Sequence, residues 1–492
     1  MRRDQTSSPQ SLPPALLFAR LNPGVTLESG TEGSLSALCD GQAIRLGKYS
    51  ARSVQRAADL ETGLQLDAAG LSDAEGQKEI HELVRRLALY GVVEYRLARA
   101  QRGADLVVIE PQMRGYAPRV TELDEDRVLV LSRFAYMRRR GGDMVLESPR
   151  AGALFRLCDA DIAATIASLS EPRTVRQLSR ERGFPGVELL ALLVDCQILF
   201  VPDSGSDKGL RASEGDDGLV LWDFHDLLFH ARSTNGRHAN PSGGMHAYAH
   251  LVEPPPAVRP SWPGTPIDLH RFDAPPSRPA TALAALLRKR HSTRSFDERR
   301  PITLAEVAWF LDGAARILSL EQLHDNDDDG PATKIAARPY PSGGASYELE
   351  LYLAVDRCEG LARGFYHYDA ARHALVPIEV SERRLDAMLA DAQFAMGAPA
   401  APQILVTMAA RFGCVSWKYS GFAYSLILKH VGVLMQTFYL MATEMELGAC
   451  AIGVANIDLF AKMTGLEFHI EGSVGQIAIG RGGDTGSTPG DV

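Results

Sequence analysis

The segment at residues 290–296, Arg-His-Ser-Thr-Arg-Ser-Phe, places two arginines and a serine at alternate positions. In an extended segment alternate side chains point to the same side, so Arg290, Ser292 and Arg294 are expected to converge on one anion. Guanidinium groups bind phosphate through paired, charge-assisted hydrogen bonds, and a serine hydroxyl adds a neutral donor. The alternative is a solvated basic turn, because the two residues before the segment are also basic.

Three further motifs follow along the chain in a fixed order. They are Pro-Ser-Gly-Gly-Ala at residues 341–345, Trp-Lys-Tyr at 417–419 and Gly-Ala-Cys-Ala-Ile-Gly at 448–453. Together with the first motif they resemble the SagB/ThcOx-type azoline dehydrogenases of thiazole- and oxazole-modified peptide biosynthesis, which have the nitroreductase-like FMN fold. The resemblance covers residues 218–482 and implies an α+β domain that binds FMN at a homodimer interface.

Length and composition bound the class of protein. A chain of 492 residues with 45% hydrophobic and 23% charged residues is expected to form about two to four globular domains. Its net charge of −9 argues against a nucleic-acid partner. We expect no signal peptide and no membrane span. The six scattered cysteines fit reduced thiols, so a cytoplasmic location is expected.

The first 200 residues repeat one pattern, a hairpin followed by helices and a closing strand. After a flexible arm at residues 1–20, the copies occupy residues 21–105 and 106–202, which indicates a duplication at a spacing of about 100 residues. The expected strands are residues 34–39, 43–46, 92–95, 128–131, 134–137, 144–146 and 198–201, and the expected helices are residues 80–87, 159–169, 174–182 and 187–194.

Both copies resemble winged-helix modules. In the modified-peptide family the matching modules resemble precursor-recognition elements, which bind a leader peptide as an added strand at a sheet edge. This implies an azoline-containing precursor peptide as partner, with its leader docked on these modules, and a cyclodehydratase beside it. Two alternatives are a purely structural role and a DNA-binding winged helix, and the acidic net charge opposes the second.

Residues 203–275 are expected to be a linker and a proline-rich entry segment that wraps the dimer. The spacing of its histidines, His225, His230, His238, His246 and His250, matches no zinc pattern, so no metal site is predicted. His225 or His230 is instead a candidate for a place near the substrate channel. The acidic loop at residues 324–330 lacks the ligand spacing of a calcium loop.

Residues 276–492 are expected to be the FMN domain, with strands at 348–355, 364–369, 403–408 and 475–480 and a long helix at 420–446. Glycines in the Pro-Ser-Gly-Gly turn let the backbone approach a flavin ring closely. The resemblance implies a phosphate clamp completed by the last arginine, a backbone N–H at the flavin N5 and a glutamine reaching across the dimer. The implied cofactor residues are Arg290, Ser292, Arg294, Pro341, Ser342, Gly343, Gly344, Gln436, Ala451, Ile452, Gly453 and Arg481.

The pair Lys418 and Tyr419 matches the catalytic Lys-Tyr pair of the family. Oxidation of an azoline to an azole removes a proton from a ring carbon and passes a hydride to flavin. A lysine acts as the base when desolvation or nearby positive charge lowers its pKa, and an adjacent tyrosine donates a hydrogen bond or shares the proton. The family often continues with arginines, whereas this chain continues Ser-Gly-Phe-Ala-Tyr. That difference bears on the identity of the ring substrate more than on the class of reaction.

The leading hypothesis is an FMN-dependent azoline dehydrogenase whose flavin is reoxidised by O2. One alternative is an NAD(P)H-dependent nitroreductase or quinone reductase, which needs neither peptide-docking modules nor the base Lys418. Another is a non-catalytic scaffold that holds the peptide and the cyclase together. A carrier-bound substrate of nonribosomal synthesis is a further alternative, which the amino-terminal modules disfavour.

Overall fold

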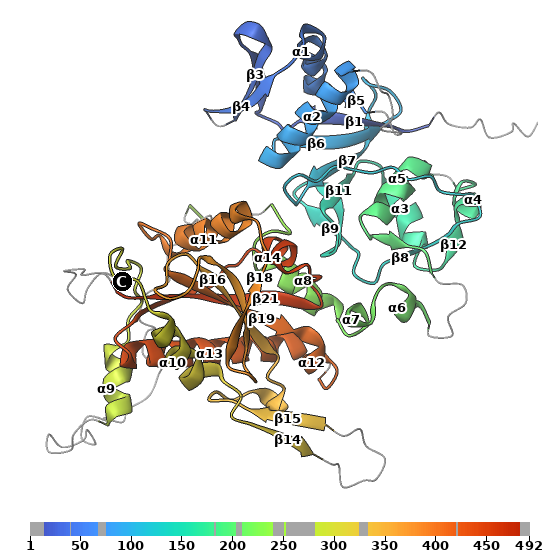
Figure 1. Ribbon diagram of the computed structural model, residues 1–492. Helices are drawn as coiled ribbons and strands as arrows, with labels where there is room; N and C mark the ends of the chain where they lie inside the picture. Colours follow the sequence, from blue (N-terminus) through green and yellow to red (C-terminus); the bar gives the residue numbers. More distant parts are fainter. Residues whose placement is uncertain are drawn as a thin grey trace, which may run out of the picture. The chain divides into compact units, whose positions relative to one another are not determined.

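The computed structural model of the chain describes residues 14–39, 41–66, 75–181, 184–202, 209–239, 250–251, 281–323, 333–419 and 422–482. The chain divides into two compact units, Met1–Ala239 and Asn240–Val492 (Figure 1). Most of the expected arm at residues 1–20 and of the linker at 203–275 lies outside the described residues, as does the acidic loop at 324–330. The expected domain boundaries stay predictions.

The first half of unit 1 contains the expected hairpin, helix and strand. Helix α2 buries Ile80, Leu83 and Leu87, which are spaced along one face of a helix. Gly91, just after α2, has a φ of 71°, the left-handed conformation that commonly ends a helix. The elements are β1 Leu16–Leu21, β2 Thr26–Ser29, β3 Ser34–Cys39, β4 Gln42–Lys48, α1 Ala51–Ala57, β5 Leu64–Gln65, α2 Glu75–Tyr90 and β6 Val93–Ala98.

The second half of unit 1 also has the expected order of elements. Its hairpin turns at Gly141, which has a φ of 61°, and helix α4 is shorter than the predicted residues 174–182. Thr174 and Gln177 form a capping box at its start. The elements are β7 Asp105–Pro111, β8 Val128–Leu131, β9 Tyr136–Arg140, β10 Asp143–Glu147, β11 Ala153–Leu157, α3 Ala160–Ser168, β12 Arg173–Thr174, α4 Val175–Leu178, α5 Val187–Asp195, β13 Leu199–Phe200, α6 Gly209–Ser213, α7 Asp217–Val220 and α8 Phe224–Arg232.

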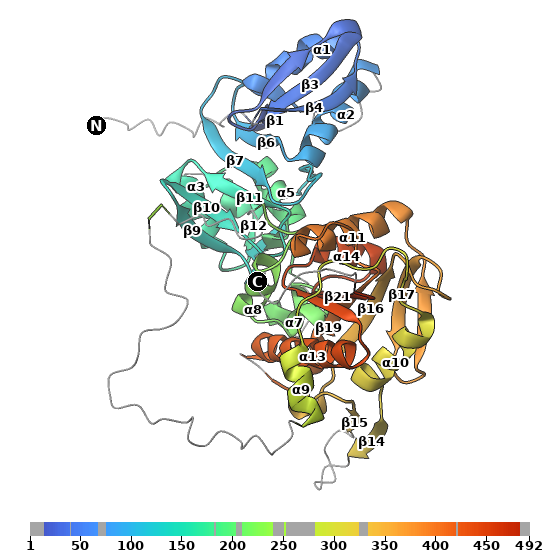
Figure 2. The same cartoon turned by 90° about the vertical axis from the view of Figure 1, so that its left-hand side faces the viewer.

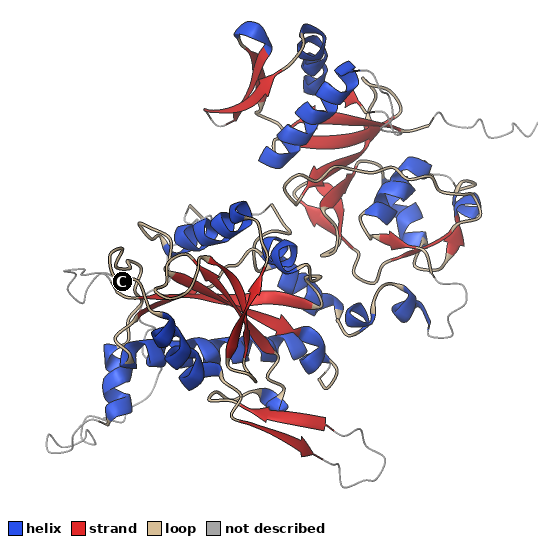
Figure 3. Ribbon diagram, in the orientation of Figure 1, coloured by secondary structure: helices blue, strands red, loops and turns tan. Residues whose placement is uncertain are grey.

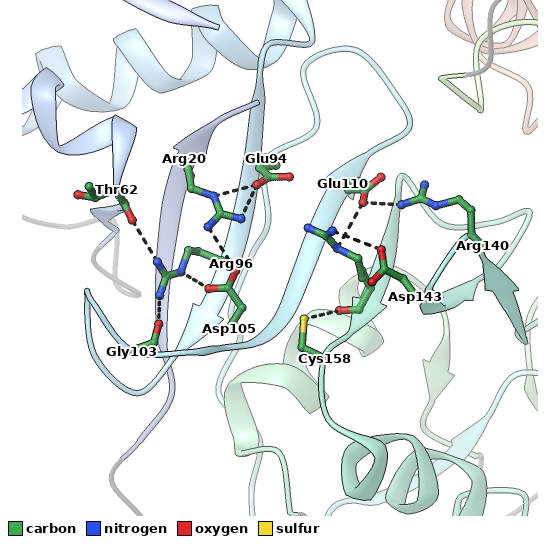
Figure 4. Close-up of polar contacts among 11 residues, drawn as sticks. Arg20, Thr62, Glu94, Arg96, Gly103, Asp105, Glu110, Arg140, Asp143 and Cys158 are labelled. Carbon is green, nitrogen blue, oxygen red and sulfur yellow. Dashed lines mark hydrogen bonds and ion pairs between the residues drawn. The ribbon is translucent and has the colours of Figure 1, made fainter. Parts of the chain in front are cut away.

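A single seven-stranded sheet joins both halves of unit 1. Its order is β5-β1-β6-β7-β11-β10-β9, and the β6–β7 pair crosses the boundary predicted between the two modules. One face of this sheet carries alternating charges (Figure 4). Arg96 pairs with Asp105 at 2.7 Å and Arg140 with Glu110 at 2.6 Å. The two predicted modules therefore share a sheet, and their assignment as winged helices stays a prediction.

Unit 2 is a six-stranded antiparallel sheet with helices on both faces, which confirms the mixed α+β class (Figures 2 and 3). The strand order is β18-β17-β16-β19-β21-β20. Phe310 and Phe438 stack at 5.1 Å and join α10 to α13. The elements are α9 Ala282–Lys289, α10 Leu304–Ala315, β14 Ser319–Leu323, β15 Thr333–Ala337, β16 Leu349–Val355, β17 Gly364–Asp369, β18 Ala374–Ile378, α11 Glu382–Met396, β19 Ile404–Arg411, α12 Phe412–Ser416, α13 Ala423–Glu444, β20 Gly448–Ile452, α14 Ile457–Thr464 and β21 Glu471–Gly480.

Helix α13 lies along one face of the unit 2 sheet and positions most of the candidate site. It has 22 residues, and its most apolar stretch has a mean hydropathy of 1.3, so by length and composition alone it could cross a membrane. Buried core helices of soluble proteins have the same length and composition. Here Ile427, Leu434 and Phe438 are buried against the rest of the unit.

Candidate functional site

The segment at residues 290–296 leaves α9 and runs along the sheet margin. The Thr293 N–H donates to the Ala449 carbonyl oxygen of β20 at 2.8 Å. Phe296 forms a β-bridge with Gly482, just past β21. The arginine and serine motif is therefore fixed at its middle and at its carboxyl end beside the sheet.

Two polar side chains of the motif contact one tyrosine of α13. The Ser292 hydroxyl lies 2.9 Å from the Tyr439 hydroxyl, and the Arg290 guanidinium lies 5.1 Å from the centre of its ring. Arg294 is exposed and close enough to Cys450 to oppose the rise that burial gives the pKa of that thiol. Neither arginine forms an ion pair with any carboxylate among the described residues. Two arginines and a hydroxyl without an acidic partner suit an anion site.

Tyr439 also connects this motif to the strand expected at the flavin. The Ala451 N–H donates to the Tyr439 hydroxyl oxygen at 2.8 Å. The amide of Ala451 is thus engaged by the protein, whereas Gly453, just past the end of β20, is exposed with open space where a Cβ would stand. Within the predicted trio Ala451, Ile452 and Gly453, the last is the amide best placed to meet a ligand.

The Pro-Ser-Gly-Gly segment forms a tight turn, with the 3₁₀ turn η4 at Gly343–Ala345. Gly344 has a φ of 60°, and Ala345 and Tyr347 also have positive φ, 53° and 40°. Such conformations are costly for residues other than glycine and persist where surrounding contacts enforce them. Pro341 and Gly344 are exposed, so the turn presents its backbone to solvent.

Lys418 and Tyr419 lie directly against this turn. A Cβ placed on Gly344 would stand 2.5 Å from the Tyr419 hydroxyl oxygen and 2.8 Å from the Lys418 Nζ. The Lys418 side chain is exposed, and its Nζ lies 5.6 Å from the centre of the Tyr419 ring. Phe422 adds a second ring 5.4 Å from that of Tyr419. The structure thus brings the predicted catalytic pair and the predicted glycine turn together.

Arg481 and Gln436 differ from the other predicted cofactor residues in their surroundings. The Arg481 guanidinium donates to both carboxylate oxygens of Glu306, at 2.7 and 2.8 Å. Glu306 also caps α10 in a box with Thr303. Gln436 is exposed on α13, away from the buried face of that helix. The phosphate role of Arg481 and the cross-dimer role of Gln436 stay predictions.

A hollow of about 180 Å³ opens on the other side of the arginine motif. His291 and Thr293 of the segment line it, whereas Arg290, Ser292 and Arg294 do not. Lys289 pairs with Glu446 at its rim, at 3.8 Å. The lining residues are Lys289, His291, Thr293, Tyr439, Thr443, Glu446, Leu447, Gly448, Ala449 and Gly482.

A second polar cluster occupies the end of the sheet just before α12. His367 lies 3.2 Å from Glu350, and their hydrogen bond raises the pKa of the imidazole. Burial raises the pKa of Glu471, whose carboxylate accepts the Tyr352 hydroxyl at 2.6 Å. Arg411 pairs with Glu350 and leads into α12 and Lys418.

Two family models match the chain. Residues 287–481 match the nitroreductase family, and residues 129–239 match the cyanobactin oxidase ThcOx. A curated relative from Methanocaldococcus jannaschii, named as a nitroreductase, is 32% identical over 171 residues, which are 35% of this chain and 78% of the relative. The chain belongs to the nitroreductase family. Its resemblance to the ThcOx-type enzymes is also confirmed, and this match begins further toward the amino terminus than the motifs indicated.

Several solved structures are also similar to the chain, all at low identity. A Ralstonia eutropha nitroreductase is 22% identical and covers 43% of this chain and 89% of its own, with a TM-score of 0.32. The E. coli microcin synthetase McbBCD complex with truncated pro-MccB17 bound is 18% identical. The match covers 55% of this chain and 97% of that one, with a TM-score of 0.38. A Desulfovibrio desulfuricans nitroreductase in complex with FMN is 14% identical. The match covers 44% of this chain and 94% of that one, with a TM-score of 0.28.

Sequence reasoning missed three polar residues that organise this nitroreductase-family unit. Tyr439 and His430 stand within an apolar helix, where a buried hydroxyl or imidazole requires a partner. Gln403 is fully buried, and its side-chain oxygen accepts the backbone N–H of Ile302 and of Arg481. The presence of these polar groups among apolar neighbours was the available signal, but their partners are far away in the sequence.

Candidate histidines of the entry segment fall mainly in unit 1. His230 is fully buried and stacks on Trp222 at 5.7 Å, while His225 is exposed. His246 lies outside the described residues. Among the described residues, no three His, Cys, Asp or Glu side chains gather as metal ligands would.

Proposed function

We propose that this nitroreductase-family protein is an FMN-dependent dehydrogenase that oxidises thiazoline or oxazoline rings in a ribosomally made peptide to thiazole or oxazole. The observation that carries the proposal is the position of Lys418 and Tyr419 against the Gly344 backbone. A reductase that receives hydride from a nicotinamide needs no base at this point. The match to the cyanobactin oxidase ThcOx supports the same proposed function.

The residues present fit a flavin mononucleotide. Arg290 and Arg294 would hold its phosphate together with Ser292, since neither guanidinium is engaged by a carboxylate of the described residues. The exposed glycines Gly344 and Gly453 leave room for close approach of a planar ring. When bound, FMN supplies the hydride acceptor, and O2 is the proposed final oxidant.

Lys418 is the proposed base, and Tyr419 its partner. A ring bound against Gly344 would cover the exposed Nζ and exclude water from it, which is the condition under which a lysine serves as a base. The amine would take the proton from the ring carbon while the hydride leaves from that ring. The Tyr419 hydroxyl, beside the Nζ, would orient the amine or share its proton.

The proposed partners follow from the rest of the chain. The precursor peptide would dock through its leader at a sheet edge of unit 1, and a cyclodehydratase would supply the azoline rings. A homodimer is supported by the exposed stripe Ser425, Lys429, Gly432 and Gln436 along α13, whose spacing keeps these residues on one side of the helix.

The experiment that tests the proposal is mass spectrometry of an azoline-bearing peptide incubated with the FMN-loaded protein in air, without NADPH. Loss of two hydrogens per ring is expected, and Lys418→Ala should abolish it while retaining FMN. Lys462→Ala, which removes an exposed lysine of α14 outside the turn and outside the α13 stripe, is the matched control. An unchanged mass with several azoline peptides would refute the proposal.

A nitro or quinone reductase is the second candidate, favoured by the nitroreductase name of the curated relative. It predicts rapid NADPH oxidation with a nitroarene or quinone that Lys418→Ala leaves intact. A non-catalytic scaffold would instead retain little FMN and show neither activity.

A further inference from the structure

Beneath the glycine turn lies a buried acid and imidazole that the proposed reaction does not use. Glu348 is fully buried, and His430 on α13 is 4% exposed. The His430 Nδ1 lies 2.8 Å from the Glu348 Oε1, and the Gly343 N–H donates to the His430 Nε2 at 2.7 Å. The imidazole therefore joins a helix to the backbone of the turn.

These contacts define the state of the imidazole. A backbone N–H can only donate, so the Nε2 of His430 carries a lone pair and no hydrogen. The hydrogen then resides on Nδ1 and is donated to the Glu348 carboxylate. The carboxylate also lies 3.4 Å from the Ser342 hydroxyl, which accepts the Tyr347 N–H at 3.0 Å. Glu348 thus selects the tautomer that lets His430 hold Gly343.

The turn that this pair holds would not keep its shape unaided. Gly344, Ala345 and Tyr347 all have positive φ, and such backbone relaxes unless its neighbours constrain it. Gly344 is also the residue against which Lys418 and Tyr419 rest. Any relaxation of the turn therefore moves the surface that sets the position of the Lys-Tyr pair.

We propose that His430 and Glu348 are positioning residues for Lys418 and Tyr419, acting through the backbone of Gly343 and Gly344. Both are too buried to touch a peptide substrate. The activity readout of this inference rests on the proposed function, but the placement of the pair can be measured without it.

The first measurement is the acylation rate of Lys418 by an N-hydroxysuccinimide ester, followed by peptide mass spectrometry, with Lys462 on α14 as internal control. His430→Phe removes the acceptor for the Gly343 N–H and should change the Lys418 rate about fivefold, the factor expected for one lost hydrogen bond. His430→Gln places an amide oxygen near the former Nε2 and should restore the rate. Equal Lys418 rates in all three proteins, with Lys462 unchanged, would overturn the inference.

The second measurement is turnover of an azoline peptide per bound FMN. His430→Phe should lower kcat about 100-fold with little change in KM, because a displacement near 1 Å of a catalytic group costs that much. His430→Gln should retain most of the turnover, whereas a merely structural role would make both variants lose FMN and fold together. If His430→Phe does not fold, Glu348→Ala and Glu348→Gln take the places of His430→Phe and His430→Gln. Glu348→Gln should then keep the wild-type labelling rate of Lys418, and equal rates in both Glu348 variants and the wild type would refute the inference.

The two hypotheses fail separately. A wild-type protein that oxidises no azoline peptide refutes the proposed function, and the labelling of Lys418 still decides whether His430 and Glu348 set its position.

Discussion

Gly344→Ala is the substitution that most directly tests whether the glycine turn places the Lys-Tyr pair. The new Cβ would stand 2.5 Å from the Tyr419 hydroxyl oxygen and 2.8 Å from the Lys418 Nζ. Ordinary contact between heavy atoms is about 3.5 Å, so the hydroxyl must retreat by about 1 Å and the Nζ by somewhat less. Both atoms are the ends of flexible side chains, so they move and the backbone does not.

The expected effects on stability and on turnover therefore differ. Alanine in the left-handed conformation, at the φ of 60° and ψ of 24° found here, costs about 1 kcal/mol. For a unit of this size that corresponds to about 2–4 °C in Tm. A displacement near 1 Å of the catalytic groups should lower kcat about 100-fold.

Gly397→Ala is the matched control. Gly397 ends α11 at a φ of 61° and ψ of 33°, with nothing within 4 Å of a Cβ added there. The Gly397→Ala variant should show the same decrease in Tm as Gly344→Ala and keep wild-type turnover. The assay is azoline oxidation by mass spectrometry, normalised to bound FMN, beside a thermal melt of each variant. Equal turnover of the two variants would refute the role assigned to the turn.

Three further predictions concern the surroundings of the site. Arg290→Ala should lower FMN retention at least tenfold by filtration and absorbance, since a charge-assisted phosphate contact contributes about 1.5–3 kcal/mol; unchanged retention would move the anion site elsewhere. Tyr439→Phe should cost about 1–3 kcal/mol in chemical denaturation, because the partly buried Ala451 N–H loses its acceptor, and an unaltered midpoint would contradict this. The hydrogen bond to Glu350 raises the pKa of His367 in the folded protein, so this pair stabilises the fold fully below about pH 6.5 and its contribution is lost as the pH rises through the folded-state pKa. His367→Asn should reduce this loss of Tm with rising pH, and identical curves of Tm against pH would contradict the prediction.

Elements with a clear local pattern were predictable from the sequence. The strand expected at residues 364–369 is β17, and the helix expected at 420–446 is α13, at Ala423–Glu444. Aromatic residues, which favour strands, in the first segment and a long apolar run without proline in the second determined these outcomes. The family motifs assigned both the glycine turn and Lys418 to the flavin site, but neither the motifs nor their spacing predicted that the two would be in contact.

The contacts that organise the site were not predictable, because each depends on residues far apart in the chain. Tyr439 and Ser292 are 147 residues apart, and Glu348 and His430 are 82 apart. The partner of Arg481 shows the same difficulty: Glu306 was recognisable as a helix cap, but the same carboxylate also accepts the guanidinium. Local rules assign such a side chain one role, and tertiary packing gives it two.

Helix α13 fixes a length within the site. His430 contacts the glycine turn, and Tyr439 contacts the arginine motif, so one rigid rod of nine residues separates the two ends by about 13.5 Å. An insertion of one residue between them would lengthen the rod by about 1.5 Å and rotate one end by about 100° relative to the other. The separation between the turn beside the proposed base and the proposed phosphate site is therefore set by the number of residues in a helix, and not by the length of any loop.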